Sequence, residues 1–212
     1  MSLNHPPLPE RSGATRVAPP VPTAGAGKRV LDLALSLAAG VVLLLPALAI
    51  ALLVRLTSRG PALYWSDRVG RDNAIFRMPK FRSMKIETPA VATHLLADPH
   101  AHLTPIGGFL RKSSLDELPQ LWSVLRGDMS LVGPRPALFN QHDLVALRTE
   151  QGVHRLLPGV TGWAQVNGRD ELPIPQKVAL DAEYLRRQSL ALDLEILART
   201  VWKVLRRDGV SH

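Results

Sequence analysis

The sequence predicts an α+β protein, mainly helical, in which a broken membrane helix precedes a compact domain with a few short strands. Three observations support this prediction. A long apolar segment near the N-terminus is interrupted by proline, apolar residues recur at helical spacing in the C-terminal part, and only two short stretches resemble strands. The chain of 212 residues suffices for one ordinary domain, expected at 57–212, after a tail at 1–27 and an anchor at 28–56.

The composition favours an anionic partner, because the formal net charge is +8. The sequence contains no cysteine, which excludes disulfides, thiolate nucleophiles and cysteine-ligated zinc. Residues 1–27 carry six prolines among small and polar residues, a composition that predicts a disordered tail. A basic protein could also bind nucleic acid, but aromatic residues make up only 5% and no known binding motif is present. We therefore expect no nucleic-acid partner.

The apolar segment at 30–54 contains only two polar residues. A straight helix of this length would reach about 37 Å, more than the roughly 30 Å hydrocarbon core of a bilayer. Pro46 lies inside the segment and is expected to bend or break the helix. Cations flank both ends, and such flanks prefer the cytoplasmic side: Lys28, Arg29, Arg55, Arg59, Arg68 and Arg71. These features favour a re-entrant hairpin; a kinked transmembrane helix and a buried helix of a soluble protein are the alternatives.

The segment that follows predicts a short hairpin. Residues 63–65 and 75–84 have weak strand character around a turn at 70–73. A polar connection follows at 88–105, and its three histidines are more typical of a solvated loop than of a metal site.

The rest of the domain is expected to be helical. Thr104 and Pro105 are typical of an N-cap followed by proline at the first helical position. Ser114 is expected to cap the next helix, which ends near Gly127. The remaining expected elements are a loop at 129–136, a helix at 137–151, a loop at 157–169, and helices at 175–188 and 190–207.

The helix at 190–207 is amphipathic and basic. It could lie on an anionic bilayer, or pack on the domain core with a solvated basic face. Its expected apolar face consists of Leu194, Leu197, Val201, Val204 and Leu205, with Trp202 at the boundary.

Asp116 and Glu117 are adjacent carboxylates at an expected helix start. One interpretation is a capping box, in which the Ser114 hydroxyl and the Glu117 carboxylate bind backbone N–H groups. A functional interpretation uses the same geometry. Free N–H groups at a helix start attract phosphate and favour an ionised Asp116, which a carboxylate nucleophile requires. Glu117 could supply an oxygen to Mg²⁺. The two interpretations are compatible.

Several cations are candidates for binding phosphate. Arg111 and Lys112 precede the carboxylates by about one helical turn, and Arg135 lies between two prolines that restrict its backbone. Lys80 and Arg82 lie on one face of an expected strand. The segment 159–169 combines glycines, a tryptophan and amides, so it could bind a nucleobase or sugar, or form a packed loop.

Together, in this order, these segments resemble the bacterial sugar transferases, the monotopic phosphoglycosyl transferases that start glycan assembly on polyprenyl phosphate. The resemblance covers about 28–210. It rests on the proline-broken apolar segment and on the motifs KFRSM at 80–84, SLDELPQL at 114–121, SLVGPRP at 130–136 and PGVTGWAQVNGR at 158–169. The acidic residues that follow Arg169 depart from the family's pattern and bear on sugar recognition.

The resemblance implies an enzyme that transfers a sugar 1-phosphate from a UDP-sugar to undecaprenyl phosphate, with Mg²⁺, and releases UMP. This would be the first membrane step of exopolysaccharide, capsule, O-antigen or glycoprotein glycan assembly. It further implies a catalytic domain on the cytoplasmic face of the bacterial inner membrane, against anionic lipid, and leaves room for a homo-oligomer. Pro46 matches the break that makes the anchor re-entrant.

The resemblance also implies roles for individual residues. Asp116 would be the nucleophile that forms a phosphosugar–aspartyl intermediate, with Glu117 as the metal ligand beside it. The residues assigned to substrate phosphates are Arg111, Lys112, Arg135, Lys80, Arg82 and Arg169. Two alternatives remain open: a direct transferase in which Asp116 is only a metal ligand, and a non-enzymatic membrane-anchored scaffold of a polysaccharide assembly complex.

Overall fold

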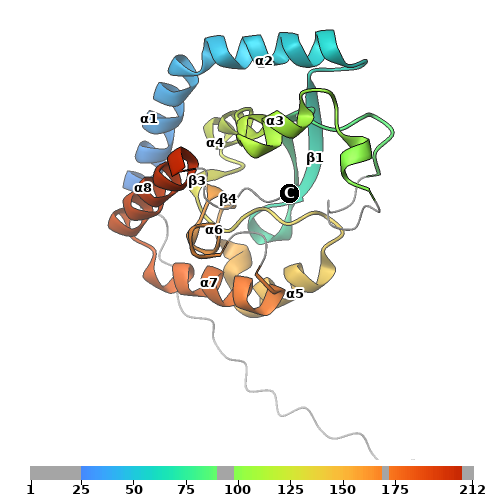
Figure 1. Ribbon diagram of the computed structural model, residues 1–212. Helices are drawn as coiled ribbons and strands as arrows, with labels where there is room; N and C mark the ends of the chain where they lie inside the picture. Colours follow the sequence, from blue (N-terminus) through green and yellow to red (C-terminus); the bar gives the residue numbers. More distant parts are fainter. Residues whose placement is uncertain (1–24, 90–97, 169–171, 207–212) are drawn as a thin grey trace, which may run out of the picture.

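The computed structural model describes residues 25–89, 98–168 and 172–206. Most of these residues are helical, and two small sheets lie inside the ring of helices (Figure 1). The expectation of an α+β, mainly helical protein is thus confirmed. The short 3₁₀ segments are η1 (Arg71–Asn73), η3 (His100–His102), η4 (Leu115–Glu117) and η5 (Val153–Arg155).

The apolar segment forms two helices, α1 (Ala26–Val42) and α2 (Leu44–Thr57), which meet at 62°. No single helix in the described ranges is long and apolar enough to cross a membrane, but this bent pair meets the criteria of length and composition together. The break lies at Leu43, and Pro46 follows in the first turn of α2, where a helix tolerates a missing N–H. Both helices expose large apolar side chains, among them Val42 of α1 at 74% and Leu45 of α2 at 76%.

The first strand of the hairpin is longer than its sequence pattern predicts, and the second is shorter. Strand β1 (Leu63–Val69) pairs antiparallel with β2 (Ile75–Phe81), and Tyr64 lies opposite Lys80. The predicted turn is confirmed, with Asp72 and Asn73 at positive φ. The expected extension of the second strand to residue 84 is wrong, because the ladder ends at Phe81.

Helix α3 (Gly107–Lys112) begins later than expected. Thr104 does not cap it; its hydroxyl donates to the Ser83 carbonyl at 3.3 Å, and Ile106 flanks the helix instead. Helix α4 (Gln120–Arg126) ends, as expected, at Gly127, whose φ of 97° is readily adopted only by glycine.

Two regions expected as loops contain regular structure. Strands β3 (Ser130–Val132) and β4 (Gly159–Thr161) pair in parallel, and α6 (Trp163–Asn167) follows. Such short elements have too few residues to show a period in sequence. Close backbone contact makes glycine necessary here, since a Cβ on Gly159 would lie 2.1 Å from the Gly133 nitrogen. Helix α5 (His142–Glu150) is shorter than the 137–151 expected, whereas α7 (Ile174–Arg187) and α8 (Leu190–Arg206) begin and end within about one residue of expectation.

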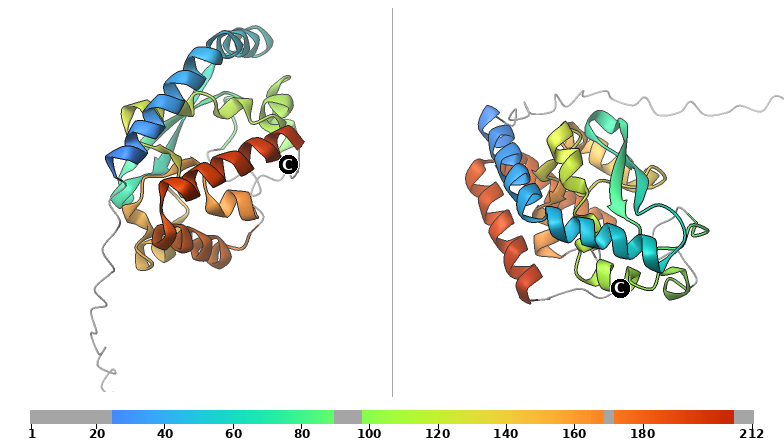
Figure 2. Two further views of the ribbon diagram at one scale, coloured as in Figure 1. Left: turned by 90° about the vertical axis from the view of Figure 1, so that its left-hand side faces the viewer. Right: turned by 90° about the horizontal axis from the view of Figure 1, so that it is seen from above.

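Helix α8 packs on the core beside α1, as the views in Figures 1 and 2 agree. Leu192 and Ile196 are buried in the main cluster. The predicted apolar face is packed only in part: Leu197 contacts this cluster, whereas Leu194 and Val201 are 52% and 59% exposed. The interpretation of a helix packed on the core is therefore confirmed, and contact of its outward apolar residues with a bilayer stays a prediction.

One face of α1 is polar and buried against the domain. The Lys28 ammonium donates to Asp193 at 2.7 Å, and the Asp32 carboxylate accepts the Leu131 N–H at 3.0 Å. The Arg29 guanidinium donates to two carbonyls at the end of α4, Val124 O and Leu125 O. Lys28 and Arg29, which belong to the predicted basic flank, are therefore engaged inside the protein, and they fix α1 to the domain.

Candidate active site

Asp116 and Glu117 lie on the 3₁₀ turn η4 between α3 and α4. Ser114 precedes them with φ of 57°, makes no side-chain cap, and accepts the Glu117 N–H only through its backbone carbonyl. The predicted capping box is therefore wrong, because the Glu117 side chain is directed to two cations instead. The leucines on either side of the pair, Leu115 and Leu118, pack against the cluster that contains Ile50 and Val54 of α2. This packing holds the carboxyl pair against the broken helix.

Glu117 joins three segments of the chain. Its Oε1 accepts a hydrogen bond from Lys80 Nζ at 2.8 Å and another from Arg135 Nη2 at 2.9 Å. The Glu117 side chain is 19% exposed. Burial opposes ionisation of this carboxyl, but the charges and hydrogen bonds of Arg135 and Lys80 hold its pKa well below the usual range. Glu117 is therefore ionised at neutral pH.

The pKa of Asp116 is shifted in the opposite direction. Asp116 is 8% exposed. Burial raises its pKa from 3.8 to about 6, against the charges of Lys80, Arg111 and Arg135, while the neighbouring Glu117 charge adds to the rise. Adjacent carboxyls with pKa values pushed apart are typical of catalytic pairs, in which the two groups have different tasks.

The other predicted phosphate ligands are placed as follows. Lys112 is exposed, and Arg111 Nη1 contacts the Met84 sulfur at 3.3 Å. Arg82 is 5% exposed, and its guanidinium donates to Pro61 O and to the carbonyl and hydroxyl of Ser58. These contacts tie the end of β2 to the end of α2 and to the loop that follows α2. Arg169 lies outside the described residues. The structure thus brings together Asp116, Glu117, Lys80, Arg111 and Arg135.

The segment 159–168 is a packed part of the fold. The Trp163 ring contacts the guanidinium groups of Arg187 and Arg199, each 5.2 Å from the ring centroid. Trp163 also packs against the main core cluster. These contacts favour the packed-loop interpretation of this segment over a stacking surface for a base.

The carboxyl pair fits Mg²⁺ only in combination with a phosphorylated substrate. No group of three or more His, Cys, Asp or Glu side chains gathers within the described residues. Mg²⁺ is usually held by one or two carboxylates together with substrate phosphates, and two carboxyls match that donor set.

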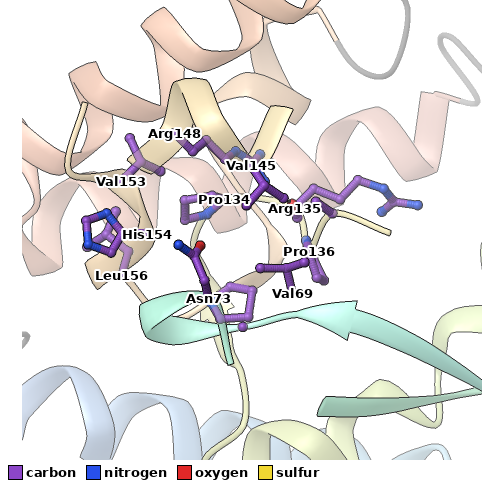
Figure 3. A pocket seen from close by; sticks show the side chains of 13 residues that line it. Val69, Asn73, Pro134, Arg135, Pro136, Val145, Arg148, Val153, His154 and Leu156 are labelled. Carbon is purple, nitrogen blue, oxygen red and sulfur yellow. Dashed lines mark hydrogen bonds between the residues drawn. The ribbon is translucent and has the colours of Figure 1, made fainter. Parts of the chain in front are cut away.

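Arg148 and Asp181, a buried ion pair whose arginine donates to the Arg135 carbonyl, were not predicted from the sequence. Arg148 lines a pocket behind Arg135, together with Asn73 and His154 (Figure 3). The figure shows the Arg135 guanidinium directed away from this pocket. An isolated arginine and an isolated aspartate on separate helices carry no sequence signal of a buried pair.

Comparison with known proteins identifies the family of the chain. The family described as bacterial sugar transferase matches residues 23–207. A UDP-galactose-lipid carrier transferase of Erwinia amylovora is 40% identical over 197 residues, 86% of this chain and 41% of that protein. An undecaprenyl-phosphate glucose phosphotransferase of Komagataeibacter xylinus is 43% identical over 82% of this chain and 35% of its own length. An uncharacterized sugar transferase of Bacillus subtilis, EpsL, is 44% identical over 75% of this chain and 77% of its own.

The chain thus spans less than half the length of the first two relatives and most of the third. The matched range contains the broken helix, the carboxyl pair and the cations around it. This chain belongs to the bacterial sugar transferase family.

Proposed function

We propose that this protein transfers a sugar 1-phosphate from a UDP-sugar to undecaprenyl phosphate, with Asp116 as the nucleophile. The observation that carries the proposal is the pair of adjacent carboxyls with opposite pKa shifts, surrounded by cations and packed against an exposed apolar helix. Relatives named for glucose and galactose phosphotransfer to undecaprenyl phosphate support it.

The first half-reaction forms an acyl phosphate. An ionised Asp116 oxygen attacks the phosphorus bonded to the sugar, the bond from that phosphorus to the bridging oxygen breaks, and UMP leaves with the electron pair. In the second half, an oxygen of undecaprenyl phosphate attacks the same phosphorus, and the Asp116 carboxylate is released.

Cations reduce the repulsion between the Asp116 carboxylate and the anionic phosphate of the donor that it attacks. Lys80 and Arg135 meet at Glu117, and Arg111 also acts on the Asp116 charge, so positive charge surrounds the reacting group. Glu117 and Asp116 would hold Mg²⁺ together with the substrate phosphates, and the ion would neutralise the charge that develops on the leaving phosphate.

We further propose that α1 and α2 enter the membrane from the cytoplasmic face and return to it. The exposed apolar residues of both helices, the 62° break and the basic residues after α2 support this arrangement. The attached domain would then meet the lipid phosphate at headgroup depth and UDP-sugars in the cytoplasm.

A radiolabelled donor tests the covalent route. Purified protein incubated with a UDP-sugar labelled in the sugar should become labelled and release UMP before any lipid acceptor is added. Asp116→Asn should abolish both signals. If UMP forms only when undecaprenyl phosphate is present, the direct transferase with Asp116 as a metal ligand is correct. If Asp116→Asn supports normal glycan initiation in cells, the scaffold alternative is correct.

Cysteine labelling tests the re-entrant anchor. The natural chain has no cysteine, so Gly25→Cys before α1 and Arg59→Cys after α2 each introduce a single thiol. A Cβ at Gly25 meets nothing within 4 Å, and Arg59 is exposed. An impermeant maleimide should label both sites from the same side of sealed vesicles. Labelling from opposite sides would mean that the segment crosses the bilayer.

A further inference from the structure

The loop that carries Arg135 is held by its carbonyl oxygens. Prolines on both sides of Arg135 remove two N–H groups, so the loop has few donors of its own. Four consecutive carbonyls, those of residues 134–137, each accept a hydrogen bond from another segment. The donors are Gly159 N to Pro134 O at 2.9 Å, Arg148 Nη1 to Arg135 O at 2.8 Å, Arg68 Nη1 to Pro136 O at 3.2 Å and Val69 N to Ala137 O at 3.0 Å.

The contact to Arg135 itself comes from a buried ion pair. Arg148 on α5 is 7% exposed, and Asp181 on α7 is 1% exposed. The Nε and Nη2 atoms of Arg148 donate to Asp181 Oδ2 at 2.9 and 2.6 Å, which leaves Nη1 directed at the Arg135 carbonyl. A guanidinium is a planar fork, so fixing one edge on a carboxylate also fixes the direction of the remaining nitrogen.

We propose that Arg148, oriented by Asp181, is a positioning residue that sets Arg135 on Glu117. The connection runs from Asp181 through Arg148 to the Arg135 backbone, and from the Arg135 guanidinium to Glu117 Oε1 at 2.9 Å. Neither Arg148 nor Asp181 would touch substrate. Their effect on the reaction rests on the proposed function, because only then does Arg135 act on a phosphate.

The conservative change Arg148→Lys separates positioning from folding. A lysine keeps the positive charge beside Asp181, so the buried carboxylate stays paired, but one ammonium cannot reproduce a fork directed at two partners. We expect the variant to fold and its kcat/KM for UMP release to fall by about 10- to 100-fold, the range for a misplaced catalytic group. Arg187→Lys is the matched control: Arg187 pairs with Glu183 on the surface of α7, and its replacement should leave kcat/KM unchanged.

A double-mutant cycle with Arg135→Met gives the decisive comparison. If Arg148 acts through Arg135, Arg148→Lys should cost nothing further once the Arg135 guanidinium has been removed. If the two fold-decreases in kcat/KM multiply in the double variant, the proposal is wrong. A paired variant, Arg148→Met with Asp181→Leu, removes both buried charges and should reproduce the loss shown by Arg148→Lys; wild-type kcat/KM in this variant would also overturn it.

Thermal unfolding keeps the proposal testable if the proposed function fails. If the wild-type chain releases no UMP from any UDP-sugar, the double-mutant cycle of Arg148→Lys and Arg135→Met is evaluated from melting temperatures alone. The decreases caused by Arg148→Lys and Arg135→Met should then be clearly less than additive in the double variant, because the two residues belong to one contact network. Strictly additive decreases would show that Arg148 does not position Arg135.

Discussion

The buried Asp116 carboxyl should make the protein less stable than its own inactive variant. Above pH 6 the folded protein carries a charge that burial disfavours, whereas the unfolded chain exposes that charge to water. Asparagine has nearly the same shape and no charge. We therefore expect Asp116→Asn to abolish transfer and at the same time stabilise the fold, a conflict between function and stability at a single residue.

The size of the effect follows from the pKa shift. A rise from 3.8 to about 6 is about 2.2 pH units, or about 3 kcal/mol at roughly 1.36 kcal/mol per unit. Between these two pH values the folded protein binds a proton that the unfolded chain does not, so the penalty is complete above pH 6 and decreases as the pH falls. For a domain of this size, about 3 kcal/mol corresponds to roughly 6–12 °C in melting temperature.

The assay is thermal unfolding of wild type and Asp116→Asn in the same detergent at several pH values. The variant should melt several degrees higher at pH 8, and the difference should nearly vanish at pH 4. Asp143→Asn on the exposed surface of α5 is the control and should show no such pH-dependent gain. A variant no more stable than wild type at pH 8, or a gain of equal size at both pH values, would refute the reasoning.

Three further predictions concern pH and packing. The kcat/KM for UMP release should fall as the pH drops through about 6, because Asp116 must be ionised to act as the proposed nucleophile; a profile that is flat from pH 5 to 8 would contradict this role. Arg82→Ala should lower the free energy of unfolding by about 2–4 kcal/mol, measured by thermal unfolding, because the hydrogen bonds of Arg82 are internal. The KM for the UDP-sugar should stay unchanged. A raised KM without loss of stability would restore the predicted phosphate role of Arg82. Gly107→Ala should lower the free energy of unfolding by at least about 3 kcal/mol or prevent folding, since its Cβ would lie 1.9 Å from the Ser83 carbonyl oxygen. The control Gly108→Ala should change it by no more than about 1 kcal/mol. Equal melting temperatures of the two variants would refute the predicted difference.

Long periodic elements and strong turn signals were predictable from the sequence. Helices α7 and α8 show apolar residues at helical spacing, and Gly127 marks the end of α4. The break in the apolar segment was also expected, near Pro46, although it lies at Leu43. In each of these cases the deciding interactions are local, so the sequence carries them directly.

Elements decided by distant contacts were not predictable. The pairing of β3 with β4 depends on close approach of segments about 30 residues apart in the chain, and three residues show no period. Ser114 has the sequence of a helix cap, but tertiary packing of Leu115 and Leu118 favours a left-handed residue and a 3₁₀ turn instead.

In the candidate site, too, local features were predictable and distant contacts were not. Asp116 and Glu117 were identifiable because adjacent carboxyls near cations are unusual in sequence. The convergence of Lys80 and Arg135 on one oxygen is a property of the fold, since 55 residues separate the two cations in the chain. Arg82 has the same kind of side chain as Arg135, and only its internal hydrogen bonds reveal its different environment.

The leucines beside the carboxyl pair connect α2 mechanically to the turn that bears Asp116 and Glu117. Because Leu115 and Leu118 pack against the cluster that contains Ile50 and Val54, we expect the turn that bears Asp116 and this helix to move together. If α2 lies in lipid as proposed, a thinner or thicker bilayer that tilts the helix would also displace the reacting oxygen. Turnover would then respond to acyl-chain length even when the headgroups and both substrates stay the same.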